Sequence, residues 1–301
     1  MINTQNIIAH LQEDPNFLPE DVLIILGPTA SGKTKLAVAL AQQLNGEIIS
    51  ADSRQVYRHM NIGTGKDLNE YEEITYHLID ILDPGEKYNI DLFIKDFKDA
   101  YSAIIQRGKR IIVCGGTGFY IQSLLQPQPY TQIPINSNLR AALEVKDKEQ
   151  LIAMLAQISL PSDFQVDISS KKRLIRAIEI GDYLRNSPDF AVSRHPKYRY
   201  KIIGLNPPVE IRRERISKRL HQRLEEGMIE EVKELLSRGI SHQELEYYGL
   251  EYKYTSYFLK GRLTYDEFYK KLETEIHRYA KRQMTYFRKM AKDGIEIAWF
   301  G

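Results

Sequence analysis

Residues 22–34, VLIILGPTASGKT, contain a short apolar run that is followed at once by a glycine-rich turn and a lysine. Consecutive apolar residues bounded by a turn are typical of a strand buried on both faces of a parallel sheet. After the turn, apolar residues recur at helical spacing up to Leu44, and Asn45-Gly46 is a helix stop signal. This stretch therefore predicts a strand, a tight turn and a helix.

The turn, Gly27-Pro28-Thr29-Ala30-Ser31-Gly32-Lys33-Thr34, matches the P-loop pattern. In such a loop, backbone N–H groups surround phosphate oxygens, the lysine adds a positive charge and the last hydroxyl binds Mg²⁺. The helix that begins near Lys33 also directs its positive end at the anion. We predict a di- or triphosphate ligand here, with Mg²⁺ as cofactor and Thr34 as a metal ligand. The alternative is a glycine turn beside a surface lysine.

The alternation of strands with helices continues up to about residue 125. We expect further strands at EIIS, at residues 77–81 (HLIDI) and at residues 110–114 (RIIVC), with a helix over residues 91–107. Such alternation predicts an α/β fold, a P-loop NTPase-like parallel sheet flanked by helices.

The strand signal disappears over residues 126–198, which we predict to be an inserted small helical subdomain. Its expected helices are LRAALEV, EQLIAMLAQI and KRLIRAIEIGDYL. The sheet resumes at YKIIGL, amphipathic helices follow up to Lys292, and IAWF predicts a last strand. We therefore divide the chain into the first part of the core (1–125), the insert (126–198), and a return to the core with C-terminal helices (199–301).

Composition limits the class of protein. The 301 residues are 43% apolar and 27% charged, which suits a globular chain with a sizeable core. No stretch approaches the roughly 18 consecutive apolar residues of a membrane span, so we expect a cytoplasmic protein with no membrane partner. We also expect a monomer. The single cysteine, Cys114, excludes an internal disulfide, and its place in RIIVC indicates a buried strand residue.

Polar residues follow two of the predicted strands, at the edge where ligands of parallel sheets bind. Asp52 comes after EIIS, so the segment 52–55 is expected to project toward the phosphates, with the Asp52 carboxylate as a general base. Capping of the next helix is the alternative. Thr117, in the Gly-Gly-Thr-Gly sequence after RIIVC, can donate to a leaving phosphate oxygen or belong to a plain turn. Asp80 can help to hold Mg²⁺ through water, although such an aspartate is more often simply hydrogen-bonded.

Two groups of cations lie late in the chain. Arg215, Arg219 and Arg223 share one face of a predicted helix, which can meet pyrophosphate or RNA, or be a solvated charged face. Residues 276–292 contain six Lys or Arg and no Asp or Glu, interleaved with aromatic residues. This composition suits contacts with RNA. The candidates for its backbone are Lys281, Arg282 and Arg288.

Seven blocks occur in order along the chain: GPTASGKT, ISADSRQVYRHMNIGTGK, YHLIDILDP, GGTGFYIQSLL, KRLIRAIEI, RISKRL and YAKRQMTYFR. In this order they resemble the tRNA dimethylallyltransferases, over most of the chain. The resemblance implies that the P-loop binds dimethylallyl diphosphate instead of ATP. It also implies transfer of the dimethylallyl group to N6 of adenosine 37, in the anticodon stem-loop of tRNAs reading codons that begin with U. The products would be N6-(dimethylallyl)adenosine and diphosphate.

The resemblance also implies residue roles. Asp52 would be the general base, and Thr117 would lie at the leaving-group oxygen and the flipped adenine. The implied diphosphate-binding residues are Gly27, Pro28, Thr29, Ala30, Ser31, Gly32, Lys33, Thr34 and Arg219. The implied tRNA-binding residues are Asp52, Ser53, Arg54, Gln55, Thr117, Lys172, Arg173, Leu174, Ile175, Arg176 and, by a looser match, Arg140, to which the basic segment adds Lys281 and Arg282.

The sequence departs from the family's pattern at several points. Gly63-Thr64-Gly65-Lys66-Asp67 replaces the usual GTAKP, Gly249-Leu250-Glu251 replaces Gly-Tyr-Lys/Arg, and Ile276-His277-Arg278 stands where Thr-Arg is common. The insert is short and lacks an Asp-Pro segment before KRLIR. No Cys/His zinc-finger extension is present, which indicates the bacterial form. We expect these differences to affect tRNA affinity and target range more than the diphosphate chemistry.

Three other functions stand as alternatives. A P-loop small-molecule kinase would use ATP as donor and Asp52 as base, and would consume ATP without RNA. An adenylate isopentenyltransferase would modify free AMP, although the basic C-terminal helices count against it. An RNA-binding protein that retained a P-loop would bind tRNA and transfer no allyl group.

Overall fold

The central element of the computed structural model, which describes residues 4–12, 17–162, 164, 166–187, 189–190 and 198–301, is a six-stranded sheet. Its order is β3-β2-β4-β1-β5-β6, and every neighbouring pair is parallel. The predicted parallel α/β fold is therefore confirmed. The strands are β1 (Val22–Leu26), β2 (Gly46–Ser50), β3 (Tyr76–His77), β4 (Arg110–Gly115), β5 (Tyr200–Leu205) and β6 (Ala298–Phe300).

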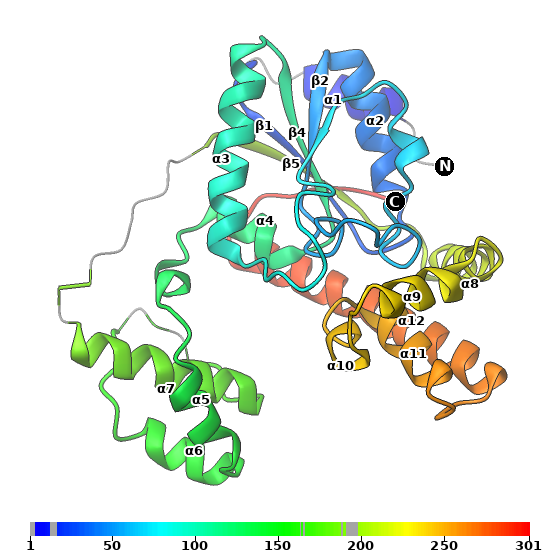
Figure 1. The fold of residues 1–301 in the computed structure, drawn as a ribbon. Helices are drawn as coiled ribbons and strands as arrows, with labels where there is room; N and C mark the ends of the chain where they lie inside the picture. The colour runs from blue at the N-terminus through cyan, green and yellow to red at the C-terminus, as the bar shows by residue number, and fades with distance from the viewer. Residues whose placement is uncertain (1–3, 13–16, 163, 165, 188, 191–197) are drawn as a thin grey trace. The chain divides into compact units, whose positions relative to one another are not determined.

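Helices cover both faces of this sheet (Figure 1). Leu23 and Ile25 of β1 pack on one face against α1 and α2, whereas Ile24 points to the other face, toward α3 and α4. Because successive side chains of a strand alternate between faces, the continuous apolar run of β1 fills both cores. The helices are α1 (Thr4–Gln12), α2 (Lys33–Leu44), α3 (Ile90–Gln106) and α4 (Gly118–Leu125).

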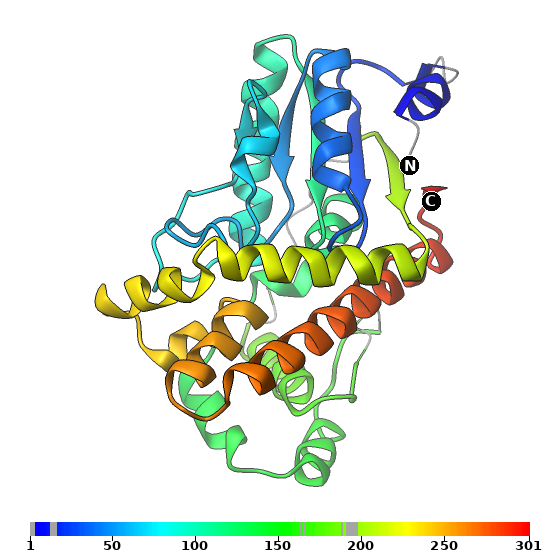
Figure 2. The same ribbon diagram turned by 90° about the vertical axis from the view of Figure 1, so that its right-hand side faces the viewer.

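The C-terminal helices lie beyond the carboxyl ends of the strands, where α8 and α12 cross (Figure 2). The longest, α12, begins with a capping box at Thr264, and Phe268, Leu272 and Phe287 lie on its buried stripe. These helices therefore close the end of the sheet at which the P-loop lies. The helices are α8 (Val209–Glu225), α9 (Met228–Ser237), α10 (His242–Leu245), α11 (Leu250–Leu259) and α12 (Tyr265–Lys292), and a 3₁₀ turn, η1 (Leu68–Tyr71), precedes β3.

The chain divides into two compact units. One comprises Met1–Gln126 and Lys197–Gly301, and the other is Pro127–Pro196. The second unit has a core of its own, in which Leu143, Leu151 and Ile178 meet. Its elements are η2 (Pro129–Gln132), α5 (Ser137–Glu144), α6 (Lys148–Leu155) and α7 (Lys171–Asn186).

The strand predicted over residues 77–81 forms only at its start, because β3 ends at His77. Leu78 and Asp80 adopt φ angles of 62° and 56°, in the left-handed region that an extended strand excludes. The backbone amides of Asp80 and Ile81 instead donate to the carbonyl oxygens of Gln55 and Val56, at 3.1 and 2.9 Å. The prediction for residues 78–81 was therefore wrong: pairing with a distant loop overrode the local apolar alternation.

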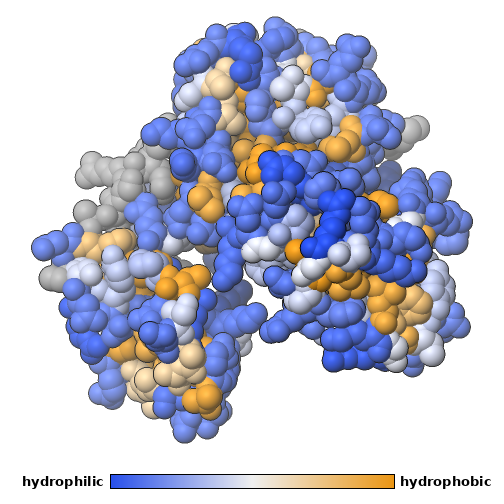
Figure 3. Space-filling view, in the orientation of Figure 1, coloured by the Kyte–Doolittle hydropathy of each residue, from blue (hydrophilic) through white to orange (hydrophobic). Residues whose placement is uncertain are grey.

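No helix within the described ranges combines the length and the apolar character that crossing a membrane requires. The face shown in Figure 3 is mostly hydrophilic, and its hydrophobic residues appear in separate groups.

Candidate active site

The P-loop joins β1 to α2, as the sequence predicts. Ala30 and Gly32 adopt left-handed φ angles of 60° and 86°, which fold the loop back on itself ahead of the helix. Lys33 is the first residue of α2, and its Nζ donates to the carbonyl oxygen of Pro28 at 3.4 Å. Burial lowers the pKa of the Lys33 ammonium. The loop thus presents the amino-terminal end of a helix and one lysine to the same place, which suits an anion.

A cavity of about 520 Å³ opens beside this loop. Its walls are the P-loop, the carboxyl ends of β2 and β4, the loop at residues 63–65, and side chains from α8, α11 and α12. Lys281 is exposed on α12 and does not line the cavity. The predicted site residues that line it are Thr29, Lys33, Thr34, Asp52, Ser53, Arg54, Gln55, Thr117, Arg219 and Arg282.

Asp52 and Thr117 follow neighbouring strands and meet at the cavity. The Thr117 Oγ1 accepts a hydrogen bond from the backbone N–H of Ser53 at 3.1 Å, and the Asp52 Oδ1 accepts one from the backbone N–H of Arg54 at 2.9 Å. Asp52 therefore closes a turn, and the alternative that it caps a following helix is wrong. The arrangement places a carboxylate and a hydroxyl beside the P-loop.

Two other residues of the predicted tRNA-binding segment make internal contacts. The Gln55 side chain accepts from Ser50 Oγ and donates to the carbonyl oxygen of Gly65, both at 3.0 Å. The Arg54 guanidinium lies over the ring of Tyr247, 4.7 Å from its centroid. Gln55 therefore joins β2 to the loop at residues 63–65, and Arg54 extends along the cavity wall.

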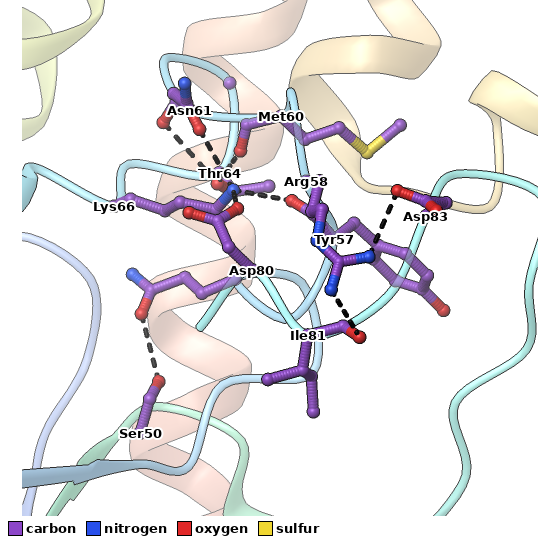
Figure 4. Close-up of polar contacts among 12 residues, drawn as sticks. Ser50, Tyr57, Arg58, Met60, Asn61, Thr64, Lys66, Asp80, Ile81 and Asp83 are labelled. Atoms are coloured by element: carbon purple, nitrogen blue, oxygen red, sulfur yellow. Dashed lines mark hydrogen bonds and ion pairs between the residues drawn. The ribbon is translucent and has the colours of Figure 1, made fainter. Parts of the chain in front are cut away.

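The buried side chain of Lys66 anchors the loop at residues 63–65 (Figure 4). Lys66 Nζ donates to the carbonyl oxygen of Tyr57 at 2.5 Å and to Asn61 Oδ1 at 3.0 Å, and pairs with Asp80. Burial lowers the pKa of Lys66, against the influence of the Asp80 carboxylate. Asp80 does not line the cavity. Asp80 therefore holds Lys66 in place, and of the two expectations for this residue the structure shows the hydrogen-bonded one.

A second carboxylate holds the other side of the loop. Glu231 of α9 accepts hydrogen bonds from the backbone N–H groups of Asn61, Ile62 and Gly63, at 2.7, 2.8 and 3.0 Å. It also accepts one from the hydroxyl of Tyr252 at 2.8 Å. These four bonds connect α9 and α11 to the loop that forms the cavity wall.

Three departures from the family pattern surround two cavity arginines. Arg219 pairs with Asp67 and donates to the carbonyl oxygen of Gly65 at 3.3 Å. Arg223 lies 3.5 Å from a carboxylate oxygen of Glu251. Gly65 has a φ of 63°, which strains any other residue, and a Cβ there would lie 1.6 Å from the Arg223 Nη2, so that the guanidinium would have to move. The departures thus lie beside cations, and we expect their first effect at the anion-binding end, in contrast to the expectation from the sequence.

Gln283 is a site residue that the sequence reasoning missed. Its Oε1 accepts from the backbone N–H of Thr29 at 2.8 Å, and its Nε2 donates to the carbonyl oxygen of Gly116 at 2.9 Å. This one amide therefore ties the P-loop to the turn after β4. The available signal is spacing, because Gln283 lies between Ala280 and Phe287 on the buried stripe of α12.

The predicted tRNA-binding residues of the second unit differ in exposure. Leu174 and Ile175 are buried in its core, where they support α7. Arg140 and Arg176 both bind the buried carboxylate of Glu179, at 2.9 and 2.6 Å. The exposed members are Lys172 and Arg173.

The parallel sheet, the P-loop and the cavity that joins it to Asp52 and Thr117 define a P-loop α/β protein with a cation-lined cavity at the carboxyl ends of its strands. Residues 55–290 match the family model described as IPP transferase, and residues 20–78 match the model described as isopentenyl transferase. The chain belongs to the IPP transferase family.

Similar proteins agree with this assignment. The chain is 49% identical to the tRNA dimethylallyltransferase 2 of Bacteroides fragilis over 283 residues, 93% of this chain and 92% of that protein. It is 43% identical to the tRNA dimethylallyltransferase 2 of Shewanella sediminis over 279 residues, with 93% and 92% covered. The crystal structure of the tRNA isopentenylpyrophosphate transferase of Bacillus halodurans matches with a TM-score of 0.68 and 34% identity, over 93% of this chain and 89% of that one. A eukaryotic dimethylallyltransferase acting on tRNA matches with a TM-score of 0.72 and 25% identity, over 92% and 73%.

Proposed function

We propose that this protein transfers a dimethylallyl group from dimethylallyl diphosphate to N6 of adenosine 37 in tRNAs reading codons that begin with U. The observation that carries the proposal is a single cavity in which Lys33, Thr34 and Arg219 occur together with Asp52 and Thr117. A diphosphate held by the cations lies, in this cavity, beside a carboxylate that can accept a proton. Both requirements of the reaction are therefore met in one place.

The P-loop side of the cavity handles the leaving group. The C–O bond of an allylic diphosphate breaks readily once the departing charge is neutralised, and preorganised N–H groups and cations do this at low cost. Lys33, Arg219 and the backbone of residues 27–34 supply these groups, and the Thr117 hydroxyl donates to the leaving oxygen. Mg²⁺ commonly takes one or two protein ligands and completes its shell with phosphate oxygens and water. The Thr34 hydroxyl fits that pattern, and the ion would add positive charge at the diphosphate.

The strand-end side handles the acceptor. N6 of adenine forms the new bond to the allylic carbon as the C–O bond breaks, and its proton passes to the Asp52 carboxylate. An adenine in an anticodon loop must leave its stack to reach such a cavity. Ser53, Arg54, Gln55, Lys281 and Arg282 would contact the RNA from the first unit. From the second unit the contacts would come from Arg140 and residues 172–176, of which Lys172 and Arg173 are the exposed cations.

The test is mass spectrometry of nucleosides from unmodified tRNA incubated with the protein, Mg²⁺ and dimethylallyl diphosphate. We expect one dimethylallyl group on adenosine 37, and no modification of free AMP under the same conditions. No product together with consumption of ATP in the absence of RNA would support the kinase alternative. Normal tRNA binding without transfer would support a non-catalytic RNA-binding protein.

A further inference from the structure

Arg223 is a buried cation with an unused hydrogen-bond donor. It lies on α8 one turn after Arg219, lines the cavity, and is 8% exposed. Its Nε is buried and has no hydrogen-bond partner among the residues that the structure describes. Burying a guanidinium is costly unless its N–H groups are bonded. The residues described therefore leave this guanidinium, which lines the cavity, incompletely hydrogen-bonded.

The pairing of Arg223 with protein groups is loose. Its nearest carboxylate is that of Glu251, at 3.5 Å, whereas a charge-assisted hydrogen bond of this kind measures about 2.7–2.9 Å. Burial, and then the neighbouring Arg219, lower the pKa of Arg223 to about 10, so its guanidinium remains charged at neutral pH. Burial raises the pKa of Glu251. A buried positive charge thus faces the cavity with incomplete compensation.

The loop at residues 63–65 is shaped to admit this guanidinium. Gly65 has a φ of 63°, and a Cβ built on it would lie 1.6 Å from the Arg223 Nη2 and 2.5 Å from the Arg219 Nη2. Two guanidinium groups therefore approach the same point of the backbone. Like charges this close repel each other. Asp67 beside Arg219 and Glu251 beside Arg223 offset part of this repulsion, and an anion that contacts both arginines offsets it further.

We propose that Arg223 is a third cation of the diphosphate site, acting beside Lys33 and Arg219, and that Glu251 holds its guanidinium in position before the diphosphate binds. The inference rests on the proposed function, because it assigns a further binding residue to the same site. In the bound state, the Arg223 guanidinium donates to a diphosphate oxygen and keeps its contact with Glu251. Arg223 is thus a binding residue, and Glu251 a positioning residue.

The test is the affinity of the full chain for inorganic pyrophosphate with Mg²⁺, measured by isothermal titration calorimetry without tRNA. Arg223→Met keeps an unbranched apolar stem and removes the guanidinium with its charge, and we expect affinity to fall about tenfold to a hundredfold. Arg223→Lys keeps the charge, so its loss should be smaller. Arg213→Met is the matched control, because Arg213 is exposed on the same helix and does not line the cavity, and its affinity should equal that of the wild type.

The variant Glu251→Gln distinguishes a binding role of Arg223 from a role limited to its ion pair with Glu251. The amide still accepts a hydrogen bond but carries no negative charge, so pyrophosphate should bind several-fold more tightly. Affinity in Arg223→Met equal to that of the wild type, or a loss in Glu251→Gln as large as in Arg223→Met, overturns the inference. Should Arg223→Met not fold, weaker binding in Arg223→Lys and tighter binding in Glu251→Gln support it, and the reverse pattern overturns it.

Transfer of the dimethylallyl group to tRNA by the wild type distinguishes failure of this inference from failure of the proposed function. If the wild type modifies tRNA and the Arg223→Met variant binds pyrophosphate as tightly as the wild type does, this inference alone is overturned. A wild-type protein that binds no pyrophosphate and modifies no tRNA overturns the proposed function and the inference together.

Discussion

Replacing Gln283 by alanine is expected to loosen the P-loop. The side-chain amide of Gln283 bonds Thr29 N at 2.8 Å and the carbonyl oxygen of Gly116 at 2.9 Å, and the residue is 7% exposed. Each bond contributes about 1 kcal/mol net, so the pair contributes about 2 kcal/mol to the free energy of unfolding. In a chain of this size about 1 kcal/mol corresponds to about 2 °C, so we expect the melting temperature to fall by about 4 °C.

The same change should weaken binding of the diphosphate donor, because Thr29 belongs to the loop that surrounds the anion. If the whole of about 2 kcal/mol appears in binding, affinity falls about thirtyfold. Thermal melting and the KM for dimethylallyl diphosphate measure the two effects. Gln222→Ala is the control, since the Gln222 amide donates to the exposed carboxylate of Glu226, just after α8, at 2.7 Å. A Gln283→Ala protein with the melting temperature and KM of the wild type would refute the reasoning.

Three further changes test other parts of the molecule. Asp52→Ala should lower kcat by about 10²–10⁴, as expected for a lost general base, and should lower tRNA affinity much less. Glu47→Gln removes a carboxylate that binds Arg107 at 2.7 Å, and this bond holds the pKa of Glu47 below its usual 4.5. The wild type should therefore be more stable than the variant above pH 4.5, and this difference should disappear as the pH falls through the lowered pKa. Glu179→Ala leaves two arginines of the second unit without their buried carboxylate and should destabilise that unit by about 3 kcal/mol.

Each of these has its own check. Single-turnover kinetics and filter binding separate rate from tRNA affinity, and an unchanged rate in Asp52→Ala would remove its role as base. Melting curves recorded from acid to neutral pH test Glu47, and a constant gap between variant and wild type contradicts the linkage. Hydrogen exchange over Pro127–Pro196 tests Glu179→Ala, and Glu144→Ala is the control because the Glu144 side chain is exposed. Equal exchange in these two variants would contradict a structural role for Glu179.

Periodicity predicted the regular elements wherever local pattern and burial agree. The strand 22–26 and the helix that follows it lie where their sequences predict. A short apolar run is buried most favourably as a central strand of a parallel sheet, and the glycine-rich turn after it ends that strand. HLIDI has the same local character, yet Leu78 and Asp80 turn left-handed to pair with the loop after β2. That outcome depends on a partner some 25 residues away, which spacing does not reveal.

The site shows the same division. The P-loop and the residues after β2 and β4 could be predicted, because strand order in a parallel sheet brings strand ends together. Gln283 could not be assigned, and for Arg223 the spacing predicted only a basic face shared with Arg215 and Arg219, since the role of each depends on which helix face packs against the loop. Both are polar residues at apolar positions of their helices, Arg223 after Leu220 and Ile216. A polar residue on a buried stripe is thus a useful signal for a site that secondary structure does not predict.

The distance along the chain between Thr29 and Gln283, which is 254 positions, has a consequence for synthesis. The P-loop leaves the ribosome early, whereas β5, the neighbour of β1, follows only after the second unit, and α8 and α12 follow later still. An unfinished chain thus carries the phosphate-binding motif without the side chains that complete its cavity. The newly made protein is expected to acquire affinity for its donor only after α12 has left the ribosome and packed against the P-loop.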